Sequence, residues 1–502
     1  LAYENSHRAV LVTASTNKKS NFKIRFRIQD TQEYYEAYET ERITSKHQIL
    51  INRQELQGND LEIELIAFDN SGDTVRRIKN IFYPEDNFPT DNFVRKNYDI
   101  RRSYVFEEAG SIYSDEDNSI IMNDISNVGF GTTYSYLFEN GQFTTKDSTQ
   151  EPWLTVGYGD TNGDGIIEFF GTGNQNVILT QATQKYGNPF ANMLFENALG
   201  EKFWGAHLYD LDNNGDDELI GYNDSSYFVY DYTGGKYQKI AMLNPGTFNI
   251  TRGSAIGDFD GDGNTEIYLT TNLGEAYIYE YNPAQKSFTQ EFYTDEIISD
   301  FNQYISAGDI TGDGKLEIMQ LTVGNKFIFD KSTSESNTVW QARFLRSTGA
   351  NEYEFFHEEV FANVRAGFIP SLGVSYRNGV SAGDVNNDGN DEFIISAFPN
   401  LYILTYNDGV KPLWIYKNTL SNSAIVHDFD NNGVKEVGFS TYGRMNFYEY
   451  SKTHPLNAST SLDGYATSES TAYLYWSEIE GASNYAVYSI EENENSQYVA
   501  VR

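Results

Sequence analysis

Apolar and polar residues alternate in short runs along most of the chain, which is the pattern of β-strands with one buried face. Phe22–Ile28 and Leu61–Phe68 show this alternation near the N-terminus, and Ala276–Tyr281 shows it with aromatic residues. Clusters of Asp, Asn and Gly separate the runs and predict turns between strands. The pattern therefore predicts an all-β fold.

One acidic unit recurs six times within this pattern. It reads D-x-[DNT]-x-[DN]-G-x-x-E, lies between two apolar runs, and begins at Asp160, Asp210, Asp258, Asp309, Asp384 and Asp428. The copies are spaced 44 to 75 residues apart, which is in the range of four-stranded propeller blades. Each repeat is predicted as a strand, the acidic loop, a second strand, an aromatic strand and an outer strand.

The acidic loop has the chemistry of a calcium site, because Ca²⁺ prefers about six to eight oxygen ligands. A coiled loop turns the side chains of positions 1, 3 and 5 to one point, and the glycine at position 6 adopts positive φ without steric cost. The variable position 7 is expected to use its carbonyl oxygen, and position 9 a carboxylate. The predicted ligands, for roughly one ion per loop, are Asp160, Asn162, Asp164, Ile166, Glu168, Asp210, Asp212, Asn214, Asp216, Glu218, Asp258, Asp260, Asp262, Asn264, Glu266, Asp309, Thr311, Asp313, Lys315, Glu317, Asp384, Asn386, Asp388, Asn390, Glu392, Asp428, Asp430, Asn432, Val434 and Glu436.

An acidic turn and an EF-hand are the two other interpretations of the loop. A single string of this kind is equally well explained as an acidic turn, since Asp, Asn and Gly are ordinary turn residues; six copies in one context favour a metal. An EF-hand needs a twelve-residue loop between helices. The flanks here, such as Trp153–Val156 and Glu392–Ser396, are strand-like instead.

With these loops the chain resembles the FG-GAP or VCBS repeat family, the calcium-bearing β-propeller of integrin α subunits and of many secreted bacterial proteins. The resemblance covers residues 95–452. It implies a propeller whose loops hold structural calcium, and it says almost nothing about the ligand.

Residues 103–147 fit a further blade with a degenerate loop, which makes a seven-bladed propeller over residues 91–452. Asp115, Asp117 and Ser119 keep positions 1, 3 and 5 of that loop, but Ile120 replaces the glycine, and no metal is predicted there. A strand from residues 92–105 is expected to complete the last blade and close the ring, which removes free sheet edges.

The longest repeat carries an insertion within residues 335–378. Trp340, Tyr353, Phe356 and Tyr376 lie around it and are a candidate aromatic platform for sugar rings or a protein partner, the alternative being core packing. Ordered insertions of this kind are often functional.

Sequences of different character flank the repeats. Residues 1–90 are predicted as an Ig-like or fibronectin-like β-sandwich. Residues 456–502 resemble the N-terminal part of a fibronectin type III-like domain, with Trp476 in a strand position.

The composition is strongly acidic, with a formal net charge of −36, and the loops account for part of it. Such a surface repels nucleic acid and anionic membranes. There is no cysteine, so a disulfide framework is excluded, and no apolar run has the roughly 20 residues of a transmembrane segment. Leu1 is interpreted as the start of a processed or partial product, and the calcium loops predict a secreted or cell-surface location.

No catalytic motif stands out, since the six histidines are scattered and most paired carboxylates belong to the loops. His207 and His427, just before two loops, are interpreted as packed residues. The leading hypothesis is an extracellular binding or adhesion protein that recognises carbohydrate or protein through the propeller. The alternatives are a carbohydrate-active enzyme similar to polysaccharide lyases, and a self-associating unit of a surface layer or filament, because fold alone does not decide function.

Overall fold

The computed structural model of the chain is all-β, as predicted, and includes a short 3₁₀ turn at Gln54–Leu56. It describes residues 2–4, 6–39, 44–86, 92–98, 100, 104–124, 131–150, 153–173, 176–196, 204–246, 250–271, 275–295, 302–323, 339–362, 379–397, 399–417, 423–441 and 444–451, and the strand segments 463–466, 472–475, 489–492 and 498–501. Within these ranges, no helix has the length and hydropathy needed to cross a membrane.

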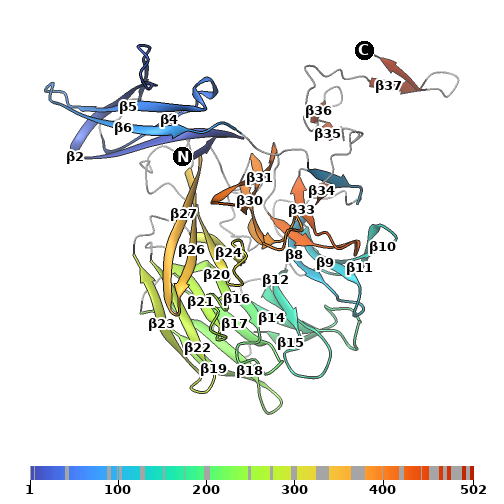
Figure 1. The fold of residues 1–502 in the computed structure, drawn as a ribbon. Helices are drawn as coiled ribbons and strands as arrows, with labels where there is room; N and C mark the ends of the chain where they lie inside the picture. Colours follow the sequence, from blue (N-terminus) through green and yellow to red (C-terminus); the bar gives the residue numbers. More distant parts are fainter. Residues whose placement is uncertain are drawn as a thin grey trace.

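Six separate four-stranded antiparallel sheets form the blades of a β-propeller (Figure 1). Their strands, sheet by sheet, are β8 (Tyr104–Gly110), β9 (Asn118–Asp124), β10 (Thr133–Glu139) and β11 (Gln142–Thr149); β12 (Trp153–Gly159), β13 (Glu168–Gly173), β14 (Asn176–Gln181) and β15 (Asn192–Glu196); β16 (Trp204–Tyr209), β17 (Glu218–Tyr222), β18 (Tyr227–Tyr232) and β19 (Tyr237–Leu243); β20 (Ile250–Gly257), β21 (Glu266–Thr271), β22 (Ala276–Asn282) and β23 (Ser287–Thr294); β28 (Val380–Gly383), β29 (Glu392–Ala397), β30 (Asn400–Tyr406) and β31 (Val410–Lys417); β32 (Ala424–His427), β33 (Glu436–Thr441), β34 (Arg444–Tyr450) and β7 (Phe93–Lys96).

Six blades of the predicted seven-bladed propeller are separate sheets, whereas the strands of the remaining repeat belong to a larger sheet. These strands, β24 (Asn302–Gly308), β25 (Glu317–Val323), β26 (Val339–Gly349) and β27 (Glu352–Ala362), continue into the N-terminal strands to make ten in all. The junction is β1 (Ala2–Glu4), which pairs in parallel with the outer strand β27. Sequence periodicity could not reveal this pairing, because β1 is three residues long and lies more than 350 residues from its partner.

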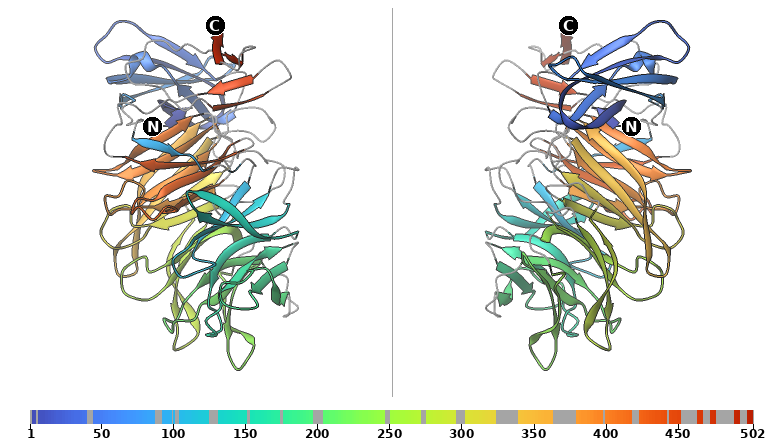
Figure 2. Two further views of the ribbon diagram at one scale, coloured as in Figure 1. Left: turned by 90° about the vertical axis from the view of Figure 1, so that its right-hand side faces the viewer. Right: turned by 90° about the vertical axis from the view of Figure 1, so that its left-hand side faces the viewer.

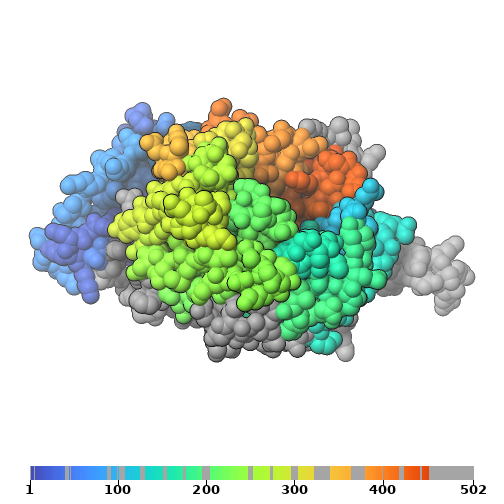
Figure 3. Space-filling view, turned by 90° about the horizontal axis from the view of Figure 1, so that it is seen from below, coloured from blue at the N-terminus to red at the C-terminus, as the bar shows by residue number. Residues whose placement is uncertain are grey.

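The first strand of each repeat lies next to the first strand of the following repeat. Contacts run from β8 through β12, β16, β20, β24, β28 and β32 and return to β8. Figure 3 shows this circuit from one side, with the colour passing from cyan through green and yellow to orange around the face. The acidic loops all join the first strand of a repeat to the second, so they share one structural position.

The last blade is closed by a strand from the other end of the repeat region, as the sequence predicted. β7 pairs with β34 over four residues, from Phe93 opposite Tyr450 to Lys96 opposite Phe447. The Phe93 ring stacks on Trp414 of the neighbouring blade with centroids 4.4 Å apart. Residues separated by more than 300 positions thus close the ring, with β7 as the outer strand of this blade.

The N-terminal strands form a bent extension of the ten-stranded sheet beyond the propeller (Figures 1 and 2). The strands are β2 (His7–Ile28), β3 (Tyr35–Tyr38), β4 (Thr44–Ile51), β5 (Asn59–Phe68) and β6 (Thr74–Tyr83). The long strand β2 pairs with β4 through its first half and with β3 and β5 through its second half. These strands are hydrogen-bonded into one continuous sheet. The β-sandwich over residues 1–90 remains a prediction.

The N-terminal segment is attached to the propeller by buried contacts. Tyr3 is fully buried, stacks on Phe361 and contacts the ring of Tyr402. Arg8 lies over the Tyr3 ring at 4.1 Å and pairs with Glu359 at 3.1 Å. Burial of a large aromatic ring is a major stabilising contribution, so the N-terminal segment is part of the core of this blade.

The candidate aromatic platform is not assembled as predicted. Trp340 has only 1% of its surface exposed and packs against Tyr304 in the core, and Tyr353 and Phe356 are half-buried. Residues 339–362 of the predicted insertion form strands β26 and β27. Tyr376 and the rest of the insertion lie outside the described residues.

The C-terminal segment contributes two strand pairs, β35 (Asp463–Ala466) with β36 (Ala472–Tyr475) and β37 (Ser489–Glu492) with β38 (Tyr498–Val501). Trp476 lies outside the described residues. The fibronectin-like domain stays a prediction.

Phe93→Ala should destabilise the propeller by about 3–5 kcal/mol, because it removes a buried ring from the closing strand. Scanning calorimetry in calcium measures the loss as a lower Tm of the propeller transition. Phe82→Ala is the matched control, since Phe82 on β6 is 54% exposed. An equal effect of the two substitutions would contradict the closing role of β7.

Candidate metal centres

The six acidic loops share one hydrogen-bond pattern. In each loop the first aspartate accepts, through Oδ2, the N–H of the glycine at position 6, at 2.8 to 3.0 Å. The side-chain oxygen at position 5 accepts the N–H of position 7 at 2.7 to 3.0 Å. These bonds coil the loop and hold positions 1 and 5 on the same side.

Glycine at position 6 is required by backbone conformation and not by space. All six of these glycines have φ between 77° and 99°, a region that disfavours residues with a Cβ atom. A Cβ added at any of them would meet no atom within 4 Å. The sequence-based interpretation of this position is confirmed.

The glutamate at position 9 begins the second strand of its repeat and is buried, with at most 1% of its surface exposed in any loop. In five loops its Oε2 accepts the N–H of position 2 at 2.7 to 3.0 Å. In the loop of Asp309 it accepts the N–H of Thr311 at 3.1 Å instead. Position 2 is itself buried in all six, and it is apolar in five (Leu211, Phe259, Ile310, Val385 and Phe429).

Burial of these glutamates is costly without a counter-charge. It raises the pKa of Glu168 and Glu317 to about 7, of Glu218 and Glu392 to about 8, and of Glu266 to about 9, and it raises the pKa of Glu436 as well. The backbone N–H groups oppose this rise in the pKa, and the neighbouring aspartates add to it. A cation in the loop would stabilise the ionised form.

Buried oxygens without a hydrogen-bond partner mark where such a cation would lie. They are Oδ1 of Asp212, Asn386 and Asp430, all at position 3, and Oε1 of Glu266 at position 9. Leaving a buried polar atom unsatisfied costs about 1–3 kcal/mol. Positions 3 and 9 are both predicted ligand positions, and oxygen is the ligand atom that Ca²⁺ prefers.

The structure brings the predicted ligands together most fully in three loops. Ligand oxygens lie within 4.8 Å of one another in the groups Asp258, Asp260, Asp262 and Glu266; Asp210, Asp212 and Glu218; and Asp428, Asp430 and Glu436. The other three loops have Asn162, Thr311 or Asn386 at position 3, and each donates a side-chain hydrogen bond to the glutamate of its own loop. The carbonyl role of position 7 stays a prediction.

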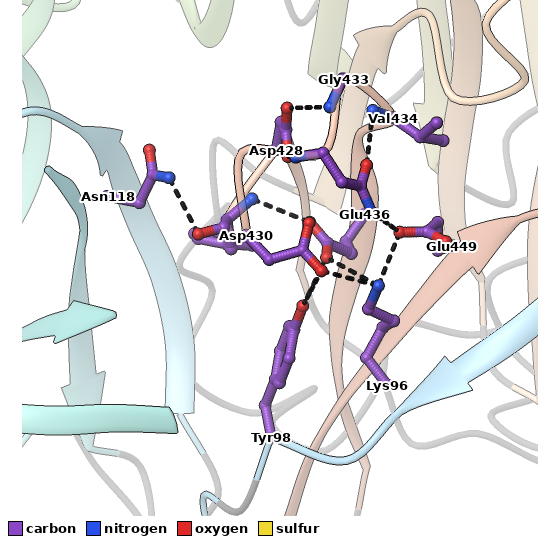
Figure 4. Close-up of polar contacts among 11 residues, drawn as sticks. Lys96, Tyr98, Asn118, Asp428, Asp430, Gly433, Val434, Glu436 and Glu449 are labelled. Atoms are coloured by element: carbon purple, nitrogen blue, oxygen red, sulfur yellow. Dashed lines mark hydrogen bonds and ion pairs between the residues drawn. The ribbon is translucent and has the colours of Figure 1, made fainter. Parts of the chain in front are cut away.

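The loop of Asp428 contains a cation that sequence analysis missed. Lys96 Nζ lies 2.8 Å from Asp430 Oδ2, 2.7 Å from Glu449 Oε2 and 3.8 Å from Glu436 Oε1 (Figure 4). Tyr98 donates to Glu436 Oε1 at 2.5 Å. No local sequence signal links residues 96 and 430, because the pairing of β7 with β34 brings them together.

The degenerate loop of the first blade is held by protein groups. Asp117 accepts the N–H groups of Tyr113 and Ser114 and is bonded by the Ser119 hydroxyl. Asp115 has a largely exposed carboxylate, 3.4 Å from Lys185 Nζ. Asp117 therefore uses its oxygens within the turn, in contrast to the orphaned oxygens in the loops of Asp210, Asp258, Asp384 and Asp428.

A cavity of about 460 Å³ lies beside this degenerate loop, and it was not predicted from the sequence. Tyr158, Lys185, Tyr186 and His427 contribute to its lining, together with Ile166 of the first acidic loop. Lys185 Nζ lies 4.7 Å from the centre of the Tyr186 ring. The volume falls within the range of small-molecule sites.

The histidines before two of the loops are packed residues. His207 is buried and bonds Ser254 Oγ at 2.7 Å, and the half-buried His427 bonds Asn118 Oδ1 at 2.9 Å. Burial lowers the pKa of His427 below its ordinary value.

Comparison with known proteins identifies FG-GAP-like repeats at residues 210–269 and 258–319, which include the loops of Asp210, Asp258 and Asp309. No curated protein sequence matches the chain significantly. Among solved structures, BBS1N from a crystal of its complex with ARL6DN, soaked with lead, is similar at 7% identity and a TM-score of 0.45, over 72% of this chain and 98% of that one. Sqt1 of Saccharomyces cerevisiae is similar at 10% identity and a TM-score of 0.42, over 78% of this chain and 92% of that one. Both TM-scores are below 0.5.

Gly263→Ala should destabilise the propeller by about 1–2 kcal/mol, the backbone cost of placing an L residue at positive φ. The matched control is Gly72→Ala, because Gly72 has φ 92° against 93° for Gly263, and both positions have open space for a Cβ. Gly72 lies in the turn between β5 and β6, so its substitution should leave the propeller transition unchanged in calorimetry. An unchanged propeller Tm for Gly263→Ala would refute the conformational requirement.

Proposed function

We propose that this chain is a calcium-stabilised extracellular β-propeller that binds a carbohydrate ligand. The observation that carries the calcium part is the convergence of ligand oxygens to within 4.8 Å in the loops of Asp210 and Asp258, each with a buried oxygen that lacks a hydrogen-bond partner. Asp258, Asp260, Asp262 and Glu266 form the fullest ligand set. Calcium there would be structural, because it neutralises buried carboxylates that link two strands of a blade.

Strands β24–β27 serve as a seventh blade in this proposal. Their first strand, β24, contacts β20 on one side and β28 on the other, which is the position of a blade in the ring. Their acidic loop, from Asp309 to Glu317, has the same hydrogen bonds at positions 1, 5, 6 and 7 as the loops of the separate sheets. The link to β1 then adds the N-terminal sheet to the outside of this blade.

The proposed calcium sites support an extracellular location, because sites of moderate affinity are filled at the millimolar calcium of extracellular modules. The net charge of −36 disfavours nucleic acid and anionic membranes as partners.

The cavity beside the degenerate loop is the proposed ligand site. Tyr158 and Tyr186 supply aromatic surface on which a sugar ring can stack, and Lys185 and Asp115 supply polar groups for hydroxyls. Ile166 belongs both to the cavity wall and to the first acidic loop. Calcium in that loop would fix one wall of the site, so ligand binding should depend on calcium.

Glu266→Gln should weaken calcium binding at its loop by at least ~10-fold, the scale found for perturbed metal coordination. The amide keeps the shape of the side chain but lacks the charge. Calcium should therefore raise the Tm of the variant less than that of the wild-type chain, while the Tm in chelator stays equal or rises. The exposed Glu116→Gln serves as control, and a wild-type Tm that is the same in calcium and chelator would contradict structural calcium.

A glycan-array screen in millimolar calcium and after chelation tests the carbohydrate part. Calcium-dependent binding to a defined glycan is expected, and Lys185→Ala should reduce it at least ~10-fold, consistent with loss of a charged hydrogen bond of about 1.5–3 kcal/mol. Lys411→Ala, exposed on β31, should not reduce it. Binding to no glycan in either condition would reject the carbohydrate ligand and direct attention to protein partners.

A further inference from the structure

The sixth acidic loop differs from the other five in holding a lysine ammonium among its carboxylates. Lys96 ends the closing strand β7, and its side chain is 20% exposed. In Figure 4 it points at Asp430, Glu436 and Glu449. Among the residues that the structure describes, no ion pair joins a predicted ligand of the other five loops to a lysine or arginine.

The loop of Asp258 provides a natural comparison. Both loops have aspartates at positions 1 and 3 and a buried glutamate at position 9. In both, the third strand places a second glutamate opposite the first, Glu280 opposite Glu266 and Glu449 opposite Glu436. Glu280 accepts a hydrogen bond from Asn264 at 3.0 Å. Glu449 accepts a hydrogen bond from the Lys96 ammonium at 2.7 Å.

We propose that Lys96 is the resident cation of the sixth loop and takes the place of calcium there. The inference rests on the proposed calcium sites of the other five loops and corrects the expectation of a sixth. An ammonium has three N–H donors, and three carboxylates surround Nζ. The positive charge of lysine at neutral pH offsets the acids that a buried loop cannot leave unpaired.

Calcium and the ammonium compete for the same carboxylate. An ion bound to Asp430 would lie at about 2.3–2.6 Å from its oxygen, and Nζ lies 2.8 Å from Oδ2 of that side chain. The two cations would then share one carboxylate, and their repulsion is strong in a partly buried site. Oδ1 of Asp430 has no hydrogen-bond partner, and it is the atom through which calcium would enter once Lys96 is replaced.

The consequence concerns how the ring is closed. Lys96 lies on the strand that joins the start of the repeat region to its last blade. A lysine in this loop ties the closing strand to β33 and β34 whatever the calcium concentration. Chelation would then loosen the other acidic loops while the closure itself holds.

The test is bound calcium per chain, measured by atomic emission after dialysis at saturating calcium. Asp260→Asn should lose one ion relative to the wild-type chain, because it removes a ligand of the fullest site. Asp430→Asn should lose none. Lys96→Met, which keeps a long apolar stem without the charge, should gain one.

A second measurement does not depend on calcium. In chelator, Lys96→Met should lower the Tm of the propeller, because it leaves three carboxylates without their cation. The control Lys411→Met, on an exposed position of β31, should not.

Loss of a calcium ion in Asp430→Asn would overturn the inference, and so would an unchanged Tm of Lys96→Met in chelator. If the wild-type chain binds no calcium at all, the proposed calcium sites fail. In that case the Tm of Lys96→Met in chelator still decides the role of the lysine.

Discussion

The propeller depends on how its buried loop glutamates are neutralised. Each glutamate begins the second strand of a repeat, is almost completely buried and bonds the backbone of the loop that precedes it. Moving this group to the surface would break the junction between the first and second strands. The fold therefore holds six glutamates inside the protein, where burial raises the pKa of each.

The six loops differ in the groups that surround the buried glutamate, and three arrangements are found. In the loops of Asp210 and Asp258 the ligand oxygens lie within 4.8 Å of one another, and each loop has one buried oxygen without a hydrogen-bond partner, which fits a metal site. In the loops of Asp160, Asp309 and Asp384, neutral side chains at position 3 share the glutamate through hydrogen bonds. In the loop of Asp428 a lysine from a distant strand supplies the charge. The same backbone motif thus accommodates different partners of the buried glutamate, because N–H groups of the loop itself hold its coil.

Much of the fold and of the loop chemistry could be predicted from the sequence, because both are local. The repeat, the glycine at positive φ and the strand starting at Glu266 depend on neighbours a few residues away. The closing strand was also predicted, since the last repeat lacked a partner. What could not be predicted came from long-range pairing: the attachment of β1 to β27, the approach of Lys96 to Asp430, and the burial of Trp340. Lys96 is not part of the pattern of a single repeat. It lies at the sixth loop because β7 pairs with β34.

The most direct test of this account is a crystal structure of the chain grown in calcium, with anomalous scattering used to locate the ions. The account predicts anomalous peaks about 2.3–2.6 Å from the carboxylates of Asp258, Asp260 and Asp262. It also predicts no peak beside Asp430, where Lys96 Nζ remains 2.8 Å from the carboxylate. Acidic loops without any peak would contradict the calcium-stabilised propeller, and a peak at Asp430 would contradict the role of Lys96.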